Sequence, residues 1–162
     1  MSYLLKEDGD KLLLETGDGI LLEDLLSIIR YYTKGDYATL PTNNDNLESI
    51  YTDQEIIDVA INDTDRVSQI ASSEYAIHQY ENYVDAEANC VLRWKGRTTL
   101  SPATSTVYLQ IYNVNTNTWE IKDSDSTSAV DTDFELTATI MDLTEYRDIT
   151  DSITCRIYQL DS

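Results

Sequence analysis

The sequence predicts an all-β protein, an antiparallel β-sandwich of jelly-roll type preceded by a short N-terminal β-meander arm. Three observations support this: apolar and polar residues alternate in many short segments, polar turns separate these segments, and no long helical periodicity is present. Alternation with a period of two puts one face of a strand on a core and leaves the other face mixed, as in antiparallel sandwiches.

The first 24 residues repeat a motif with a period of eight residues. Aligned, its copies read YLLKEDGD, KLLLETGD and GILLED. Glycine in the DGD and TGDG segments supplies the positive φ that tight turns use, so we expect a three-stranded meander. Its strands are expected near residues 3–7, 11–15 and 20–23. The alternative for the last part is a short amphipathic helix over residues 21–32, which contain no helix breaker.

The leucines of this repeat occupy successive positions rather than alternate ones. Strands with this pattern need cover on both faces, and a three-stranded ribbon cannot cover both faces itself. Three copies are also too few and too short for a solenoid. We therefore expect an oligomerisation or docking interface with another chain, formed by Leu4, Leu5, Leu12, Leu13, Leu14, Ile20, Leu21 and Leu22. The arm is expected over residues 1–40 and the sandwich over residues 41–162.

A loop is expected at residues 34–49, because this segment holds Gly, Pro and a cluster of Asn and Asp. Strands are expected after it at residues 57–61, 67–71, 75–84, 90–95, 107–111, 119–122, 134–140 and 153–158. Trp94 shares an apolar strand face with Leu92, which favours a place in the core. Tyr108 and Tyr112 lie on the face opposite the apolar one.

The chain is strongly acidic, with 30 Asp and Glu against 11 Lys and Arg and a formal net charge of −19. Such a surface repels phosphate backbones and anionic lipids, so no direct nucleic-acid or membrane partner is expected. High-salt adaptation and a Ca²⁺-rich medium both fit this charge. No apolar run reaches the length of a membrane span. The first apolar residues are interrupted by Lys6, Glu7 and Asp8, so no signal peptide is expected. We therefore expect the chain to be made in a cytoplasm.

Nothing in the sequence predicts an enzyme, and no catalytic residue is assigned. His78, the only histidine, lies in a strand context without a nucleophile motif. Cys90 and Cys155 match no zinc-binding spacing. They point inward on two predicted strands, so a disulfide is possible if those strands are adjacent. Reduced, buried cysteines are the favoured interpretation.

Turn carboxylates suggest Ca²⁺ as a possible cofactor, since calcium prefers oxygen ligands. The four candidate ligands flank one loop: Asp123, Asp125, Asp131 and Asp133. A complete EF-hand loop is absent from the sequence. Turn aspartates also bond to their own backbone in Asx turns, and this interpretation is favoured over metal binding.

Two further patterns suggest binding surfaces. Tyr112 and Trp119 could form a platform on which a sugar ring stacks, although tyrosine is also favoured in strands for its packing alone. Arg93, Lys95 and Arg97 form a basic stripe along one strand face. The stripe is expected to pair with acidic cross-strand neighbours or to receive an acidic patch of another copy.

Several stretches resemble β-sandwich modules in structural proteins of tailed bacteriophages and related viruses. They read LPTNNDNLES, DRVSQIASSEYAIHQY, RWKG, STVYLQIYNVNTNTWE, DTDFELTATI and SITCRIYQ, and LLLETGDGILLE is similar to N-terminal segments of such virion proteins. The resemblance implies a capsid decoration, head-fibre or tail-associated component in the virion. Its expected partners are a major capsid or tail protein and further copies of itself. The alternative function is a carbohydrate-binding module that recognises host-surface glycans.

Overall fold

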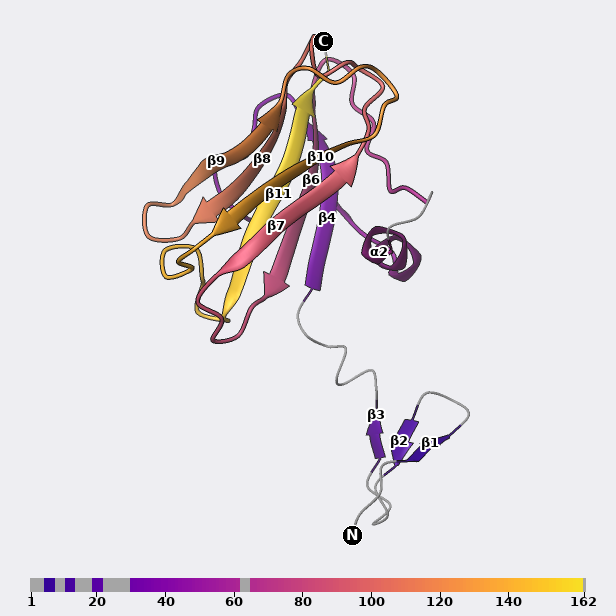
Figure 1. Ribbon diagram of the computed structural model, residues 1–162, viewed down its shortest axis with the longest axis vertical. Coiled ribbons are helices and arrows are strands. Elements are labelled where there is room, and N and C mark those ends of the chain that lie inside the picture. The colour runs from indigo at the N-terminus through magenta and orange to yellow at the C-terminus, as the bar shows by residue number, and fades with distance from the viewer. Residues whose placement is uncertain (1–4, 8–10, 14–18, 22–29, 62–64, 162) are drawn as a thin grey trace. The chain divides into compact units, whose positions relative to one another are not determined.

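The computed structural model describes residues 5–7, 11–13, 19–21, 30–61 and 65–161. The chain divides into two compact units, Met1–Arg30 and Tyr31–Ser162, named here the arm and the body and drawn in Figure 1. The boundary lies after Arg30 rather than at residue 40 as expected from the sequence. The reason is that β4 (Arg30–Tyr37) is part of the main sheet of the body.

The described part of the arm is a three-stranded antiparallel sheet, which confirms the expected meander. Its strands, in order, are β1 (Leu5–Glu7), β2 (Lys11–Leu13) and β3 (Gly19–Leu21). Leu5 is paired with Leu13, and Leu12 with Ile20. The interface predicted for the arm also includes three residues outside the described ones, namely Leu4, Leu14 and Leu22.

The body is an antiparallel β-sandwich of two unequal sheets, as the sequence predicted (Figure 1). The six-stranded main sheet has the spatial order β5 (Ser49–Ile50), β4, β6 (Tyr75–Tyr83), β11 (Ser152–Leu160), β8 (Val107–Asn113) and β9 (Thr118–Asp125). The two-stranded sheet pairs β7 (Cys90–Gly96) with β10 (Phe134–Ile140). The short β7–β10 sheet leaves part of the main sheet to be covered by other segments.

The larger core cluster lies between the two sheets. Alternate residues of β8 and β11 point into it and meet the inward residues of β7 and β10. Its buried apolar members are Leu92, Val107, Leu109, Ile111, Leu136, Ile140, Leu143, Tyr146, Ile153, Cys155 and Ile157. Trp94 packs against this cluster, with its ring centroid 5.3 Å from that of Phe134. The core position predicted for Trp94 is confirmed.

Residues 38–48 cover the opposite face of the main sheet. Leu47 packs there against Ile77 and Tyr158 in a second core cluster, and its backbone N–H donates to the Thr33 hydroxyl at 3.2 Å. The loop predicted for residues 34–49 is therefore correct in its middle only. Its first residues belong to β4, where Lys34 pairs with Ser49 of β5.

A short helix, α2 (Asp53–Ala60), stands where the sequence predicted a strand at residues 57–61, so that prediction is wrong. The helix begins with a capping box: the Glu55 N–H donates to the Thr52 hydroxyl at 3.3 Å, and the Thr52 N–H donates to the Glu55 carboxylate at 2.9 Å. This reciprocal cap satisfies two N–H groups at the start of the helix. The strand predicted at residues 67–71 is also wrong, since these residues form no regular element.

One arginine is buried on the face of the main sheet covered by residues 38–48. Arg156 is 2% exposed, and its Nε and Nη1 donate to the Gln110 side chain and the Pro41 carbonyl, both at 2.8 Å. Its guanidinium lies 4.0 Å from the centroid of the Trp119 ring. Burial lowers the pKa of Arg156 to about 10, so it remains charged at neutral pH.

Candidate functional site

A groove of about 820 Å³ lies in the body beside β7, and is named here the β7 groove. One wall is β7 and the residues that follow it, up to Leu100. The other wall is the end of α2, with Ile61 and residues 65–71. The floor comes from β4, β6 and β11 of the main sheet. This volume is within the range of about 300–1,000 Å³ that is usual for ligand sites.

The floor of the groove carries a cluster of aromatic and polar side chains. Alternate residues of β6, His78, Tyr80 and Asn82, line it. The Tyr32 hydroxyl donates to the Asn82 side chain at 2.8 Å. The Tyr51 hydroxyl is hydrogen-bonded to His78 Nδ1 and lies 3.4 Å from the Tyr80 hydroxyl. Perpendicular ring contacts between these tyrosines add to the packing.

The floor is uncharged at neutral pH. Burial lowers the pKa of His78 to about 4, and the nearby charge of Lys34 contributes in the same direction. Burial raises the pKa of both Tyr51 and Tyr80 well above its ordinary value. An acid–base catalyst works best with a pKa near the operating pH, which none of these three groups has.

A polar contact attaches helix α2 to the main sheet of the body. Lys34 of β4 pairs with Glu55 of α2, and this partner lowers the pKa of Glu55. The Lys34 ammonium also lies 5.6 Å from the centroid of the Tyr51 ring. None of the helix residues is fully buried, so the described residues cover the apolar side of α2 only in part.

Exposed apolar side chains gather at the α2 end of the groove and on its walls. Four of them line it with the following exposed fractions: Val59 39%, Ile61 54%, Ile70 82% and Val91 64%. Ile57, on the same helix, is 50% exposed. Isolated exposed apolar residues are normal on a protein surface, whereas a contiguous group of them indicates an interaction site.

The walls of the groove are rich in basic residues. Four of the eleven basic residues of the chain line it: Arg66, Arg93, Lys95 and Arg97. Arg93 pairs with Glu135 of β10 at 2.7 Å, so the cross-strand pairing expected for the basic stripe is confirmed for Arg93. Four acidic residues also line the groove: Asp58, Asp65, Asp131 and Asp161. Among the described residues, the lining of the groove therefore holds equal numbers of basic and acidic residues on a strongly acidic chain.

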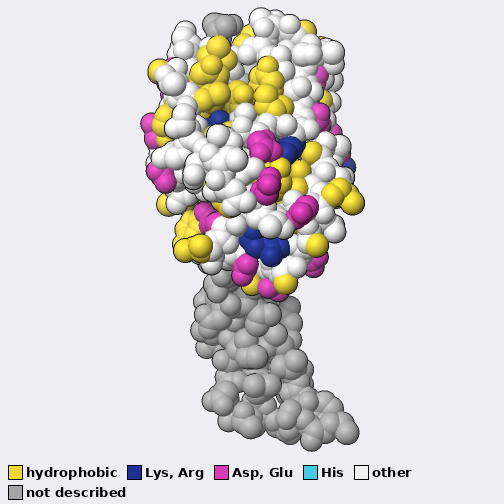
Figure 2. All heavy atoms as spheres, turned by 90° about the vertical axis from the view of Figure 1, so that its left-hand side faces the viewer, with side chains coloured by type: hydrophobic (Ala, Val, Ile, Leu, Met, Phe, Trp, Pro, Cys, Tyr) yellow, Lys and Arg dark blue, Asp and Glu magenta, His cyan; other side chains and the backbone are white. Residues whose placement is uncertain are grey.

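The side of the body that carries β8 and β9 has more acidic than basic side chains (Figure 2). Figure 2 shows the side with β8 and β9, where Asp and Glu side chains are scattered among apolar ones and Lys and Arg form only small groups. The balanced charge of the β7 groove thus differs from that of the β8–β9 side.

Among the described residues, no helix is long and apolar enough to cross a membrane.

The four predicted calcium ligands do not form a common site. Asp123 accepts a hydrogen bond from the backbone of β10 at 2.8 Å, and Asp125 accepts one from the backbone of its own turn at 2.7 Å. Asp133 pairs with Arg66 at 3.1 Å, and Asp131 is exposed. In the part of the chain that the structure describes, no three His, Cys, Asp or Glu residues are grouped to hold a metal ion.

The predicted sugar platform is not formed by Tyr112 and Trp119. Tyr112 is only 5% exposed, and the two rings meet at 65° with centroids 5.1 Å apart. Trp119 donates through Nε1 to the Asn43 carbonyl at 3.0 Å and stacks on Arg156. These rings pack residues 38–48 onto the main sheet and present no flat, exposed pair.

The two cysteines are free thiols on facing strands, β7 and β11. Burial raises the pKa of Cys155 to about 12 and raises that of Cys90 as well. Because the thiolate is the nucleophilic form, neither thiol is activated at neutral pH.

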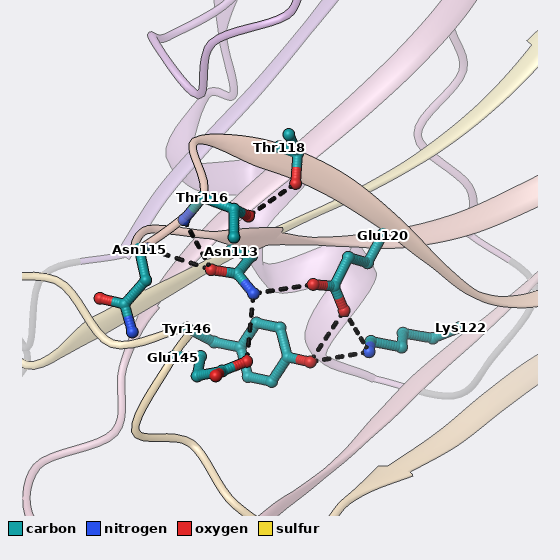
Figure 3. A network of polar contacts seen from close by, with 8 residues as sticks. All are labelled: Asn113, Asn115, Thr116, Thr118, Glu120, Lys122, Glu145 and Tyr146. Carbon is teal, nitrogen blue, oxygen red and sulfur yellow. Dashed lines mark hydrogen bonds and ion pairs between the residues drawn. The ribbon is translucent and has the colours of Figure 1, made fainter.

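A polar network closes the end of the body where β8 turns into β9 (Figure 3). The Asn113 side chain donates to Glu120 at 2.7 Å and to Glu145 at 3.2 Å. Glu120 also accepts from Lys122 at 2.7 Å and from the Tyr146 hydroxyl at 2.9 Å. Lys122 is the main cause that lowers the pKa of Glu120 to about 2. The network ties the hairpin to the loop before β11.

Comparison with known proteins gives no relative: no family model, curated protein or solved structure matches this chain. The β7 groove was not predicted from the sequence. Two sequence signals point toward it, the capping box TDQE before α2 and the aromatic residues on one face of YAIHQYENY. Neither signal indicates that the two segments lie across a groove from β7.

Proposed function

We propose that this chain is a non-enzymatic structural protein of a virion, a capsid decoration, head-fibre or tail-associated component that assembles through apolar surface. The observation that carries this proposal is α2, an amphipathic helix with no buried residue. An isolated eight-residue helix is marginal in water. Its apolar side, together with Ile70 and Val91 that line the same groove, is surface that a partner can cover.

The chemistry of the groove supports assembly rather than catalysis. His78 and the tyrosines beside it are uncharged at neutral pH, and both thiols are protonated. The sequence resemblance to virion β-sandwich modules is the reason for placing the assembly in a virus particle. A carbohydrate-binding role has less support, because Tyr112 is buried and its ring is tilted against Trp119.

The mass of the full chain in solution, measured by light scattering over a concentration series, tests the assembly. We expect an oligomer, and we expect Val59→Glu combined with Ile61→Glu to weaken self-association at least tenfold. Met141→Glu combined with Ile149→Glu is the matched control, because these apolar residues are 76% and 103% exposed and do not line the groove. A monomeric native chain, or equal losses in both variants, contradicts the proposal.

The virion location has its own test. Mass spectrometry of purified particles from the source of this chain is expected to detect the protein at a fixed ratio to the major capsid or tail protein. Cryo-electron microscopy of the same particles then places the body on the head or the tail. Absence of the chain from washed particles contradicts the virion part of the proposal and leaves the assembly test unaffected.

A further inference from the structure

We infer that the β7 groove binds the N-terminal arm of a second copy of this chain. The inference rests on the proposed function, which requires self-assembly but does not say which surfaces meet. Four features support it: the open edge of β7, the partly exposed apolar surface of the groove, the charge of the groove and of the arm, and the self-assembly that the proposed function requires.

The first feature is the edge of β7. Among the described residues, β7 pairs with β10 alone, in a register that runs from Cys90 with Ile140 to Gly96 with Phe134. Its other edge borders the groove. An edge strand offers backbone N–H and C=O groups to an incoming strand, and such strand addition is a common mode of peptide binding. The arm contains short strands of its own.

The second feature is the amount of apolar surface available. The four apolar groove residues already have part of their surface covered, and the contact must offset the translational and rotational freedom that association costs. The predicted interface of the arm adds eight leucine and isoleucine residues. The groove and the arm together can therefore bury far more apolar surface than the groove patch alone.

The third feature is charge. Residues 1–26 contain seven acidic residues and two basic ones. A net charge of −19 on the whole chain disfavours the approach of an acidic segment, whereas the described lining of the groove holds four basic residues beside four acidic ones. Lysine and arginine on an edge strand discourage indiscriminate strand pairing. Arg93 and Lys95 on β7 therefore admit an acidic strand more readily than a basic one.

The fourth feature favours a second copy over the arm of the same chain. An arm that enters the groove of its own body joins no two copies, whereas an arm that enters the groove of a second copy supplies the self-assembly of the proposed function. Reciprocal exchange of identical segments is a low-cost route to a closed dimer.

Site-specific photocrosslinking in the full chain tests this inference. A benzophenone amino acid replaces Val91 or Ile70 on the groove walls, and for comparison Ile149, which does not line the groove. We expect the two groove positions to give a covalent dimer on a denaturing gel. We expect peptide mass spectrometry to locate the crosslink within residues 1–26. The Ile149 position is expected to give at least tenfold less of this product.

The outcomes separate this inference from the proposed function. Crosslinks that join the groove to residues 1–26 without raising the mass show the arm of the same chain and overturn the inference. An oligomer that gives crosslinks only to body residues, or none, also overturns it and leaves the proposed function standing. A monomer without crosslinks overturns both. As a second variant, Lys95→Glu with Arg97→Glu is expected to reduce the dimer product at least fivefold while the circular dichroism spectrum stays native.

Discussion

The Tyr51 hydroxyl is hydrogen-bonded to His78 Nδ1 on the floor of the β7 groove. Tyr51 directly precedes the capped start of α2, and His78 lies in the middle of β6. The bond therefore holds the base of the helix against the main sheet. Both groups of this hydrogen bond stay neutral near pH 7, because burial lowers the pKa of His78 and raises the pKa of Tyr51.

We expect protonation of His78 to destabilise the body in mild acid. Its pKa is about 4 in the folded chain against an ordinary value of 6.5, so the unfolded chain binds more protons between these values. Stability then falls as the pH drops through 6.5 and stops falling from this cause below pH 4. Between pH 7 and pH 5 the loss is about 2 kcal/mol.

Urea unfolding at pH 7 and pH 5 measures this loss. The matched control is His78→Gln, which has no titrating ring but keeps every carboxylate of the native chain. We expect the native chain to lose about 2 kcal/mol more than the variant over this range. If the two proteins show the same pH dependence, His78 is not held in its neutral form by burial.

We expect replacement of the buried Arg156 by lysine to destabilise the body. Its guanidinium stacks on Trp119 and makes directed bonds to Gln110 and the Pro41 carbonyl. Lysine keeps the charge but cannot reproduce a planar, stacked, multiply donating group. We expect Arg156→Lys to cost about 1–3 kcal/mol in urea unfolding. Arg93→Lys is the control, because its side chain is 65% exposed, and it is expected to change stability by less than about 0.5 kcal/mol. Equal costs in both contradict this account.

Strands β6 to β11 of the body could be predicted from the sequence because each carries its own period-two pattern, whereas β4 and β5 were not predicted. In β8, Val107, Leu109 and Ile111 point to the core, while Tyr108 and Tyr112 lie on the other face. The pattern fails at α2, because the apolar residues of this segment satisfy both a two-residue and a helical spacing. The capping box decides between the two, as a TDQE pattern in the sequence and as a pair of hydrogen bonds in the structure.

The groove could not be predicted, because it depends on which segments face each other across the sandwich. β7 and residues 65–71 are brought together by the fold and not by any local pattern. The same holds for the candidate calcium ligands. Their spacing placed Asp123 and Asp133 on one loop, but the backbone directs one carboxylate to β10 and the other to Arg66.

We expect any side chain at position 96 to clash with the ring of Trp94. A Cβ atom on Gly96 would lie 2.3 Å from Cζ2 of the Trp94 ring, and that ring packs against Phe134. We expect Gly96→Ala to cost about 1–3 kcal/mol and to shift the tryptophan fluorescence. In a Trp94→Leu background the obstructing ring is gone, so the same substitution should cost clearly less. An unchanged cost in that background shows that the clash with Trp94 is not the cause.

Asn113 is expected to hold the β8–β9 hairpin in place. Its side chain is 2% exposed. It donates to Glu120 and Glu145, and its oxygen accepts from the backbone N–H groups of Asn115 and Thr116 at 3.0 and 3.1 Å (Figure 3). Removing a buried partner leaves several polar groups unsatisfied, each at a cost of about 1 kcal/mol or more. We expect Asn113→Ala to lose about 2–3 kcal/mol of unfolding free energy at pH 7.

The cost of Asn113→Ala should shrink in acid. Its bond to Glu120 is one of the causes that lower the pKa of that carboxyl to about 2, from an ordinary 4.5. A carboxyl group whose pKa is lowered by folding stabilises the fold at any pH above its ordinary pKa. This contribution is lost as the pH falls toward the pKa of the folded chain. Urea unfolding at pH 7 and pH 2.5 tests the effect against Asn115→Ala, whose side chain is exposed. A cost of Asn113→Ala that stays constant with pH means that the amide supports the turn and not the carboxylate.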